Sequence, residues 1–112
     1  MWDLMQEYDI RRGHHKNIEG DRLPELVREI FGKVNQMDDG FLETSFGALD
    51  MLRIKPQDKK VILVDTKMNP GVDEATAGDT IRKYNEFLQR ATGFSAKERS
   101  KRIQKKAKEG AQ

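Results

Sequence analysis

The sequence contains no cysteine, only three prolines and two histidines, and few aromatic residues, which make up 7% of the chain. Without cysteine the protein can form no disulfide, no thiolate nucleophile and no cysteine-ligated zinc site. No apolar run approaches the ~20 residues that a membrane-spanning helix needs. The segment over residues 1–5 is short and acidic and does not resemble an export signal. We therefore expect a soluble cytoplasmic protein without a membrane partner.

The composition indicates one small domain. The chain has 112 residues, of which 36% are hydrophobic and 36% are charged. This length suffices for one core and is too short for two. Because the apolar residues occur in periodic groups, the chain as a whole is not predicted to be disordered. We expect a single domain over residues 1–94, followed by a basic C-terminal helix or tail over residues 95–112.

Hydrophobic periodicity and turn residues predict the secondary structure. The expected elements are a strand over 7–12, a helix over 23–34, strands over 41–46, 50–55 and 60–68, a helix over about 73–92, and a basic helix from residue 95 onward. Apolar residues of the first helix recur at helical spacing, at Leu23, Leu26, Val27, Ile30, Phe31 and Val34. In the second helix the expected buried stripe is Ala77, Ile81, Tyr84, Leu88 and Ala91, with Phe87 at its border.

The order of these elements, β-α-β-β-β-α, predicts an α+β fold. The links between the last three strands are too short for crossovers, so neighbouring strands should be antiparallel. We expect a four-stranded, largely antiparallel sheet with both helices on one face, plus the basic C-terminal helix. Residues 61–64 are apolar on both faces, so their strand should be central. The element order resembles the half-repeat of TATA-binding-protein-like folds, a likeness that does not fix a function.

A helix stop and a helix start follow one another at residues 91–99. Gly93 suits the left-handed position just after a helix, where a side chain would be strained. Ser95 and Glu98 have the spacing of a capping box, in which each side chain accepts a hydrogen bond from the other residue's backbone N–H. The sequence therefore predicts a sharp corner between two helices.

Charge is segregated along the chain. Residues 95–112 carry seven Lys or Arg and two Glu, a net of +5 against +2 for the whole chain, so residues 1–94 carry −3. Cations spread along a helix can neutralise phosphates and release counterions, which favours binding of nucleic acid or another polyanion. The candidate phosphate contacts are Arg90, Lys97, Arg99, Lys101, Arg102, Lys105 and Lys106, and Arg11, Arg12 and Lys16 extend the basic surface.

Two alternatives to nucleic-acid binding stay open at this point. The basic helix is equally compatible with a solvated segment that only confers solubility. It also presents small residues at Ala96, Ser100, Ile103 and Ala107, which would suit a homodimer or protein-interaction surface with the charges at its rim. Salt separates these functions, because phosphate binding weakens steeply with added salt and an apolar interface does not.

No combination of residues predicts catalysis. His14 and His15 are adjacent, but a third metal ligand at a diagnostic spacing is missing from the sequence. Residues 13–21 resemble a phosphate loop without its Lys-Ser/Thr ending. Asp65, in an apolar strand, is expected to face solvent or to pair with Lys59, Lys60 or an arginine of the second helix. We therefore expect a non-enzymatic protein with no catalytic, cofactor or metal site.

Several short motifs resemble a known family. They are Tyr8, Ile10, Arg12, Gly13 and His14, then Ile18-Glu19-Gly20, Ser45-Phe46-Gly47, and a long stretch over residues 79–99. Together they are similar to a family of small archaeal proteins of unknown function, found notably in methanogens. The resemblance spans nearly the whole chain from Met5 onward, which leaves translation from Met1 or Met5 open. It implies an archaeal cytosolic protein and brings no activity.

Overall fold

The computed structural model describes residues 6–110, with side chains described for residues 6–105. The strands are β1 (Gln6–Asp9), β2 (Asn35–Gln36), β3 (Leu42–Phe46), β4 (Leu49–Pro56) and β5 (Val61–Met68). The helices are the short 3₁₀ helix η1 (His14–Asn17), α1 (Arg22–Phe31), α2 (Glu74–Thr92) and α3 (Ala96–Gly110). The α+β class predicted from the sequence is confirmed.

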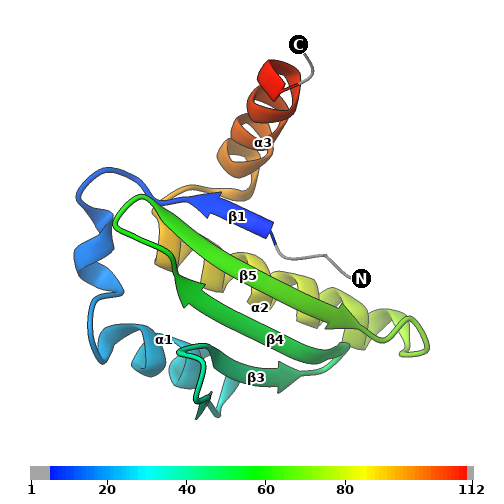
Figure 1. The fold of residues 1–112 in the computed structure, drawn as a ribbon. Coiled ribbons are helices and arrows are strands. Elements are labelled where there is room, and N and C mark those ends of the chain that lie inside the picture. The colour runs from blue at the N-terminus through cyan, green and yellow to red at the C-terminus, as the bar shows by residue number, and fades with distance from the viewer. Residues whose placement is uncertain (1–5, 111–112) are drawn as a thin grey trace.

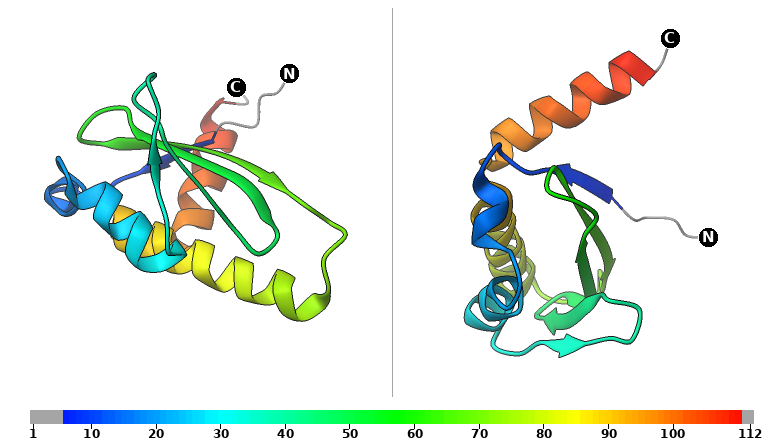
Figure 2. Two further views of the ribbon diagram at one scale, coloured as in Figure 1. Left: turned by 90° about the horizontal axis from the view of Figure 1, so that it is seen from below. Right: turned by 60° about the vertical axis from the view of Figure 1, so that its left-hand side comes forward.

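The strands form one sheet in the order β1-β5-β4-β3-β2, and every neighbouring pair is antiparallel (Figure 1). Helices α1 and α2 lie together on one face of this sheet, as expected, and the other face carries no helix (Figure 2, right). Strand β5 lies between β1 and β4, which confirms the central position predicted from its apolar residues. Helix α3 projects away from the body beside the β1 edge (Figures 1 and 2).

The prediction of four strands was wrong, because the sheet has five. The additional strand, β2, is a two-residue edge strand that pairs with Leu42 and Glu43 of β3. Its two residues, Asn35 and Gln36, are polar and exposed, so they leave no apolar alternation to detect. The first strand is also shorter than expected. After Asp9 the chain leaves the ladder, and the Arg11 N–H donates to the Thr92 carbonyl 2.7 Å away, at the end of α2.

One apolar core lies between the helices and the sheet. Leu26, Ile30 and Phe31 of α1 share it with Ile62 and Val64 of β5. The Phe31 ring lies at the centre of an aromatic group, with ring centroids 5.9 Å from Phe46 and 5.7 Å from Phe87. Burial of this α1 face against the sheet is what fixes the helix in place.

The predicted face of α2 was wrong at Ile81, and Phe87, which was expected at the border of that face, is fully buried. Ile81 is 53% exposed, whereas the neighbouring Thr80 is fully buried. The Thr80 hydroxyl accepts the Ala48 N–H at 2.8 Å and donates to the Thr76 carbonyl at 2.7 Å. Gly47 brings the β3–β4 turn close enough for these bonds, since a Cβ there would lie 2.3 Å from the Thr80 hydroxyl. A polar anchor, rather than the larger apolar residue, therefore faces the sheet.

Candidate functional site

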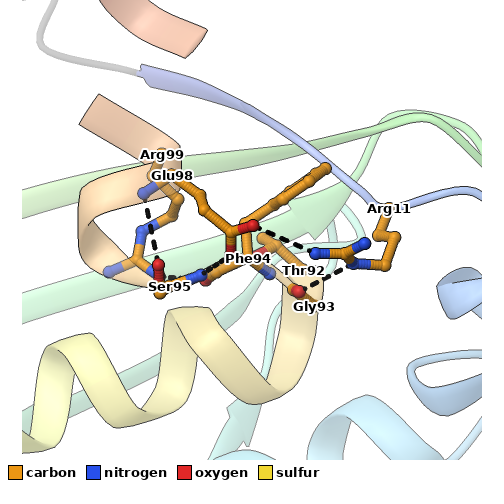
Figure 3. A network of polar contacts seen from close by, with 7 residues as sticks. All are labelled: Arg11, Thr92, Gly93, Phe94, Ser95, Glu98 and Arg99. Atoms are coloured by element: carbon orange, nitrogen blue, oxygen red, sulfur yellow. Dashed lines mark hydrogen bonds and ion pairs between the residues drawn. The ribbon is translucent and has the colours of Figure 1, made fainter. Parts of the chain in front are cut away.

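The α2–α3 corner has the geometry that the sequence predicted (Figure 3). Gly93 has φ 82°, in the left-handed region, and its N–H donates to the Gln89 carbonyl at 2.9 Å. The Ser95 N–H donates to Glu98 Oε1 at 2.9 Å, and the Glu98 N–H donates to Ser95 Oγ at 3.2 Å, which completes the capping box. These bonds set the direction in which α3 leaves the body.

Arg99 is committed to this corner. It is 6% exposed, its Nη1 donates to the Phe94 carbonyl at 2.6 Å, and its Nη2 donates to Asn85 Oδ1 at 3.0 Å. Burial lowers the pKa of the guanidinium, and the hydroxyls of Tyr8 and Tyr84 act in the opposite direction. Arg99 therefore ties the first turn of α3 to α2, and we do not retain it among the candidate phosphate contacts.

Two other arginines lie over the ring of Phe94. The guanidinium carbon of Arg11 is 4.8 Å from the ring centroid and that of Arg102 is 4.6 Å from it, both within cation–π range. Arg11 also donates from Nε to the Gly93 carbonyl at 3.0 Å and from Nη2 to Glu98 Oε2 at 3.2 Å. The two arginines are thus brought from opposite ends of the chain to one aromatic ring.

A hollow of about 850 Å³ opens beside this ring, where the exit of β1, the β4–β5 turn and the base of α3 meet. We call it the basic hollow. Five Lys or Arg residues line it, namely Arg11, Arg12, Lys59, Lys60 and Arg102, together with His15. Its carboxylate is Asp9, whose Oδ2 accepts from Arg102 Nε at 2.8 Å. The hollow is therefore strongly cationic.

All five cations are exposed, and the side chains of three of them have no partner in the part of the chain that the structure describes. Arg12, Lys59 and Lys60 are exposed, and within the described part of the chain their side chains form no hydrogen bond or ion pair. The sequence had suggested Arg11, Arg12 and Lys16 as an extension of the basic surface. Of these, Arg11 and Arg12 line the hollow. Lys59 and Lys60 were missed, although two lysines beside the Asp58 turn were the available signal.

The remaining candidate contacts are divided between α3 and α2. Lys97, Lys101 and Lys105 are exposed and recur every four residues, so they lie on one side of α3. Arg90 of α2 lies elsewhere and forms ion pairs with Glu29 at 2.6 Å and Glu86 at 3.8 Å. The side chain of Lys106 lies outside the described side chains. The structure therefore groups the α3 lysines apart from Arg90.

The histidine pair does not converge on one ligand. His14 Nε2 lies 2.7 Å from the Arg90 carbonyl, and its Nδ1 lies 3.2 Å from the Asn17 amide nitrogen. His15 instead faces Glu19, with 3.6 Å between Nε2 and Oε2. Among residues 6–105, no three His, Asp or Glu side chains are grouped so that they could hold a metal ion.

Asp65 differs from its prediction. It is 5% exposed and lies directly opposite Arg53 in the β4–β5 register, so the expectation that it faces solvent or pairs with Lys59, Lys60 or an arginine of α2 was wrong. It occupies the helix-free face of the sheet, away from the basic hollow.

In the portion of the chain that the structure describes, none of the helices is long and apolar enough to span a membrane.

The fold and the site define a small two-layer α+β protein with a cationic surface at one end of its sheet. A family model described as a domain of unknown function, DUF5611, matches residues 5–105, and the chain belongs to this family. It is similar to a hypothetical protein from Thermoplasma acidophilum whose solution structure was determined by NMR. The two are 30% identical with a TM-score of 0.60, and the match covers 88% of this chain and 96% of that one. No curated protein matches the sequence.

These comparisons confirm the coarse resemblance found in the sequence. The family is described as one of unknown function, and the similar solved structure is that of an archaeal protein. Neither comparison names an activity, a ligand or a partner, so the function has to be argued from the surface of this chain.

Proposed function

We propose that this protein binds nucleic acid without catalysis, through a surface formed by the basic hollow and the exposed lysines of α3. The observation that carries the proposal is the convergence of cations from three separate segments at one end of the molecule. Arg12 comes from the exit of β1, Lys59 and Lys60 from the β4–β5 turn, and Arg102 from α3.

The spacing on α3 suits a phosphate backbone. Successive lysines four residues apart are separated by about 6 Å along a helix with a rise of ~1.5 Å per residue. Phosphates of one duplex strand repeat every ~3.4 Å along the axis, so each lysine matches roughly every second phosphate. Contacts of this kind position a nucleic acid without reading its sequence. We therefore expect binding with little sequence preference.

A homodimer is the alternative that a specific observation favours. Ile103 is 42% exposed on the projecting helix, and Ala96 and Ser100 on the same helix are exposed as well. Two such helices packed together would bury these residues and leave the lysines at the rim. Ala107, which would extend the stripe, lies outside the described side chains.

The test uses paired charge changes. The variant Lys101→Gln/Lys105→Gln removes two cations from α3, and the control Lys33→Gln/Lys67→Gln removes two exposed cations elsewhere. Binding to a random-sequence DNA duplex and to a single-stranded RNA is measured by fluorescence anisotropy over a salt series. For the duplex, the α3 variant should lower the magnitude of the log–log salt slope by about two, or roughly one per lost phosphate contact. The control should keep the slope of the unmodified protein.

Two results would count against nucleic-acid binding. One is the absence of salt-dependent binding by the unmodified protein. The other is an equal loss of slope in the α3 variant and in the control, which would indicate only the net charge. Light scattering on the same samples tests the alternative, since a dimer that persists in high salt and dissociates in Ile103→Lys would favour the homodimer.

Three narrower expectations from the sequence stay predictions. They are a methanogen source, a cytoplasmic location and a likeness to the half-repeat of TATA-binding-protein-like folds. None of them is needed for the proposal.

A further inference from the structure

We propose that the basic hollow is a built binding site for a phosphate group, presented either by a free nucleotide or by a nucleic-acid strand. This inference deepens the proposed function but is tested separately from it. A volume of about 850 Å³ exceeds what a lone phosphate needs and falls within the usual range of small-molecule sites, about 300–1,000 Å³. The hollow therefore has room for the nucleoside that carries the phosphate.

Backbone hydrogen bonds hold the lining segments together. The Ile10 N–H donates to the Lys60 carbonyl at 2.7 Å, which joins the exit of β1 to the β4–β5 turn. The Arg11 N–H donates to the Thr92 carbonyl at 2.7 Å, which joins the same exit to α2. Within the turn, Asp58 Oδ1 accepts the N–H groups of Lys60 at 2.7 Å and Val61 at 3.0 Å. These hydrogen bonds hold the backbone segments that carry the cations in fixed positions relative to one another.

Two of the cations are already oriented. Arg102 uses Nε for its bond to Asp9, which leaves the four N–H donors of its two Nη groups for a ligand. Arg11 uses Nε and one Nη2 donor for bonds to Gly93 and Glu98, which leaves three. Because both guanidiniums already lie over Phe94, less side-chain entropy is lost when they bind an oxyanion.

The other cations supply charge that the protein does not neutralise. Lys59 and Lys60 are adjacent in the turn, and Arg12 lines the same hollow. Like charges held close together repel, and a bound anion removes that repulsion. A phosphate group combines the charge and the several acceptor oxygens that such a set of donors can satisfy together.

The experiment maps binding by amide chemical shifts in ¹⁵N-labelled full-length protein. The probes are adenosine 5′-monophosphate, adenosine as the uncharged control, and a single-stranded DNA 12-mer of mixed sequence. We expect the monophosphate to shift the amides of residues 11–13 and 59–60 in a saturable manner, and adenosine to leave them unchanged. If only the 12-mer shifts these amides, the hollow binds a phosphate of a nucleic-acid strand rather than that of a free nucleotide.

Matched variants then assign the effect to the hollow. Lys59→Gln/Lys60→Gln should weaken monophosphate binding at least tenfold, whereas Lys33→Gln/Lys67→Gln, with the same change in charge, should leave it within twofold. Because the lysine side chains in the turn are exposed, the hydrogen bonds from the backbone N–H groups of Lys60 and Val61 to Asp58 Oδ1 should persist, and unchanged thermal unfolding checks this. Arg12→Gln provides an independent variant on another segment.

The outcomes separate this inference from the proposed function. Shifts with the 12-mer confined to residues 97–105 of α3 would overturn the phosphate site and keep nucleic-acid binding. Shifts with the monophosphate in the hollow, without any effect of the 12-mer on α3, would keep the phosphate site and overturn the wider surface. Equal weakening by the turn variant and the control would show that no specific site exists.

Discussion

Two glycines that end helices allow a matched test of the α2–α3 corner. Gly32 follows α1 with φ 89°, and Gly93 follows α2 with φ 82°. Each donates its N–H to the carbonyl four residues earlier, at 2.8 Å and 2.9 Å respectively. An alanine in this left-handed conformation costs about 1–2 kcal/mol at either position. The two glycines therefore share the same backbone penalty.

Their surroundings differ. A Cβ added at Gly32 would have nothing within 4 Å, whereas one at Gly93 would lie 2.9 Å from His14 Nδ1 and 3.0 Å from His14 Cγ. The imidazole has little freedom to withdraw, because its Nε2 lies 2.7 Å from the Arg90 carbonyl in hydrogen-bonding range. Overpacking of this kind costs about 1–3 kcal/mol. We expect Gly32→Ala to lower the free energy of unfolding by about 1–2 kcal/mol and Gly93→Ala by about 2–5 kcal/mol.

Urea unfolding followed by circular dichroism measures both variants. The part of the excess cost of Gly93→Ala that is due to the imidazole should disappear in a His14→Ala background, as a double-mutant cycle would report, and the contact with Arg11 Cβ, at 3.1 Å, should remain. Equal costs for the two glycines would refute the reasoning, because they would show that the His14 ring yields without penalty. An excess that survives removal of the imidazole would place the strain elsewhere in the corner.

Two further predictions concern the core and the capping box. Ile30→Ala should lower the free energy of unfolding by about 2–5 kcal/mol, because its side chain is buried between α1 and the sheet. Ile81→Ala, the same substitution at an exposed site, serves as the control and should change the free energy of unfolding by no more than about 0.5 kcal/mol in a urea titration. Similar changes for Ile30→Ala and Ile81→Ala would contradict the position of α1. The backbone N–H of Ser95, then the Ser95 side chain and then Arg11, holds the pKa of Glu98 below its ordinary value of 4.5. Its stabilisation of α3 should therefore be complete above about pH 4.5 and decline as the pH falls through the lower folded-state pKa. Amide exchange of residues 96–105 between pH 7 and 3 measures this decline, and a similar decline in Glu98→Gln would show that another group is responsible.

Local signals in the sequence were sufficient for the corner and for α1. Gly93, Ser95 and Glu98 form hydrogen bonds with residues only a few positions away in the sequence. The apolar stripe that contains Leu26 and Ile30 has the spacing of a helix and not that of a strand. The stabilising interactions of these elements lie within the few residues that a sequence pattern describes. The prediction therefore agrees with the structure at the corner and over most of α1, but the helix ends at Phe31 rather than at Val34, because Gly32 terminates it in the left-handed conformation.

Interactions between distant segments were not predictable in the same way. Thr80 faces the core because the β3–β4 turn supplies the Ala48 N–H, a partner 32 residues away. Arg99 is buried because Asn85 and the Phe94 carbonyl receive its donors. From the sequence alone, isoleucine is expected in a core before threonine, and arginine is expected on the surface. The burial of Thr80 and of Arg99 follows instead from tertiary hydrogen bonds, which a local sequence pattern does not describe.

The basic hollow was recognised only in part for the same reason. The cations that line it come from three distant parts of the sequence: Arg11 and Arg12 follow β1, Lys59 and Lys60 lie in the β4–β5 turn, and Arg102 lies in α3. Charge counted along the sequence indicates the α3 group most clearly and suggested Arg11 and Arg12 as its extension, but it does not indicate Lys59 and Lys60, which lie among acidic and apolar residues. Their convergence follows from the pairing of β1 with β5.

The contact between Asp9 and Arg102 joins residues 93 positions apart, and β1 itself pairs only with β5. During synthesis, β1 therefore leaves the ribosome long before its strand partner, and longer still before α3. Until β5 is made, β1 lacks the strand with which it pairs, and the corner around Phe94 completes only when α3 has emerged. Folding of this end of the molecule requires closure of a long loop and should be slow compared with the β3–β4–β5 meander, whose contacts are local.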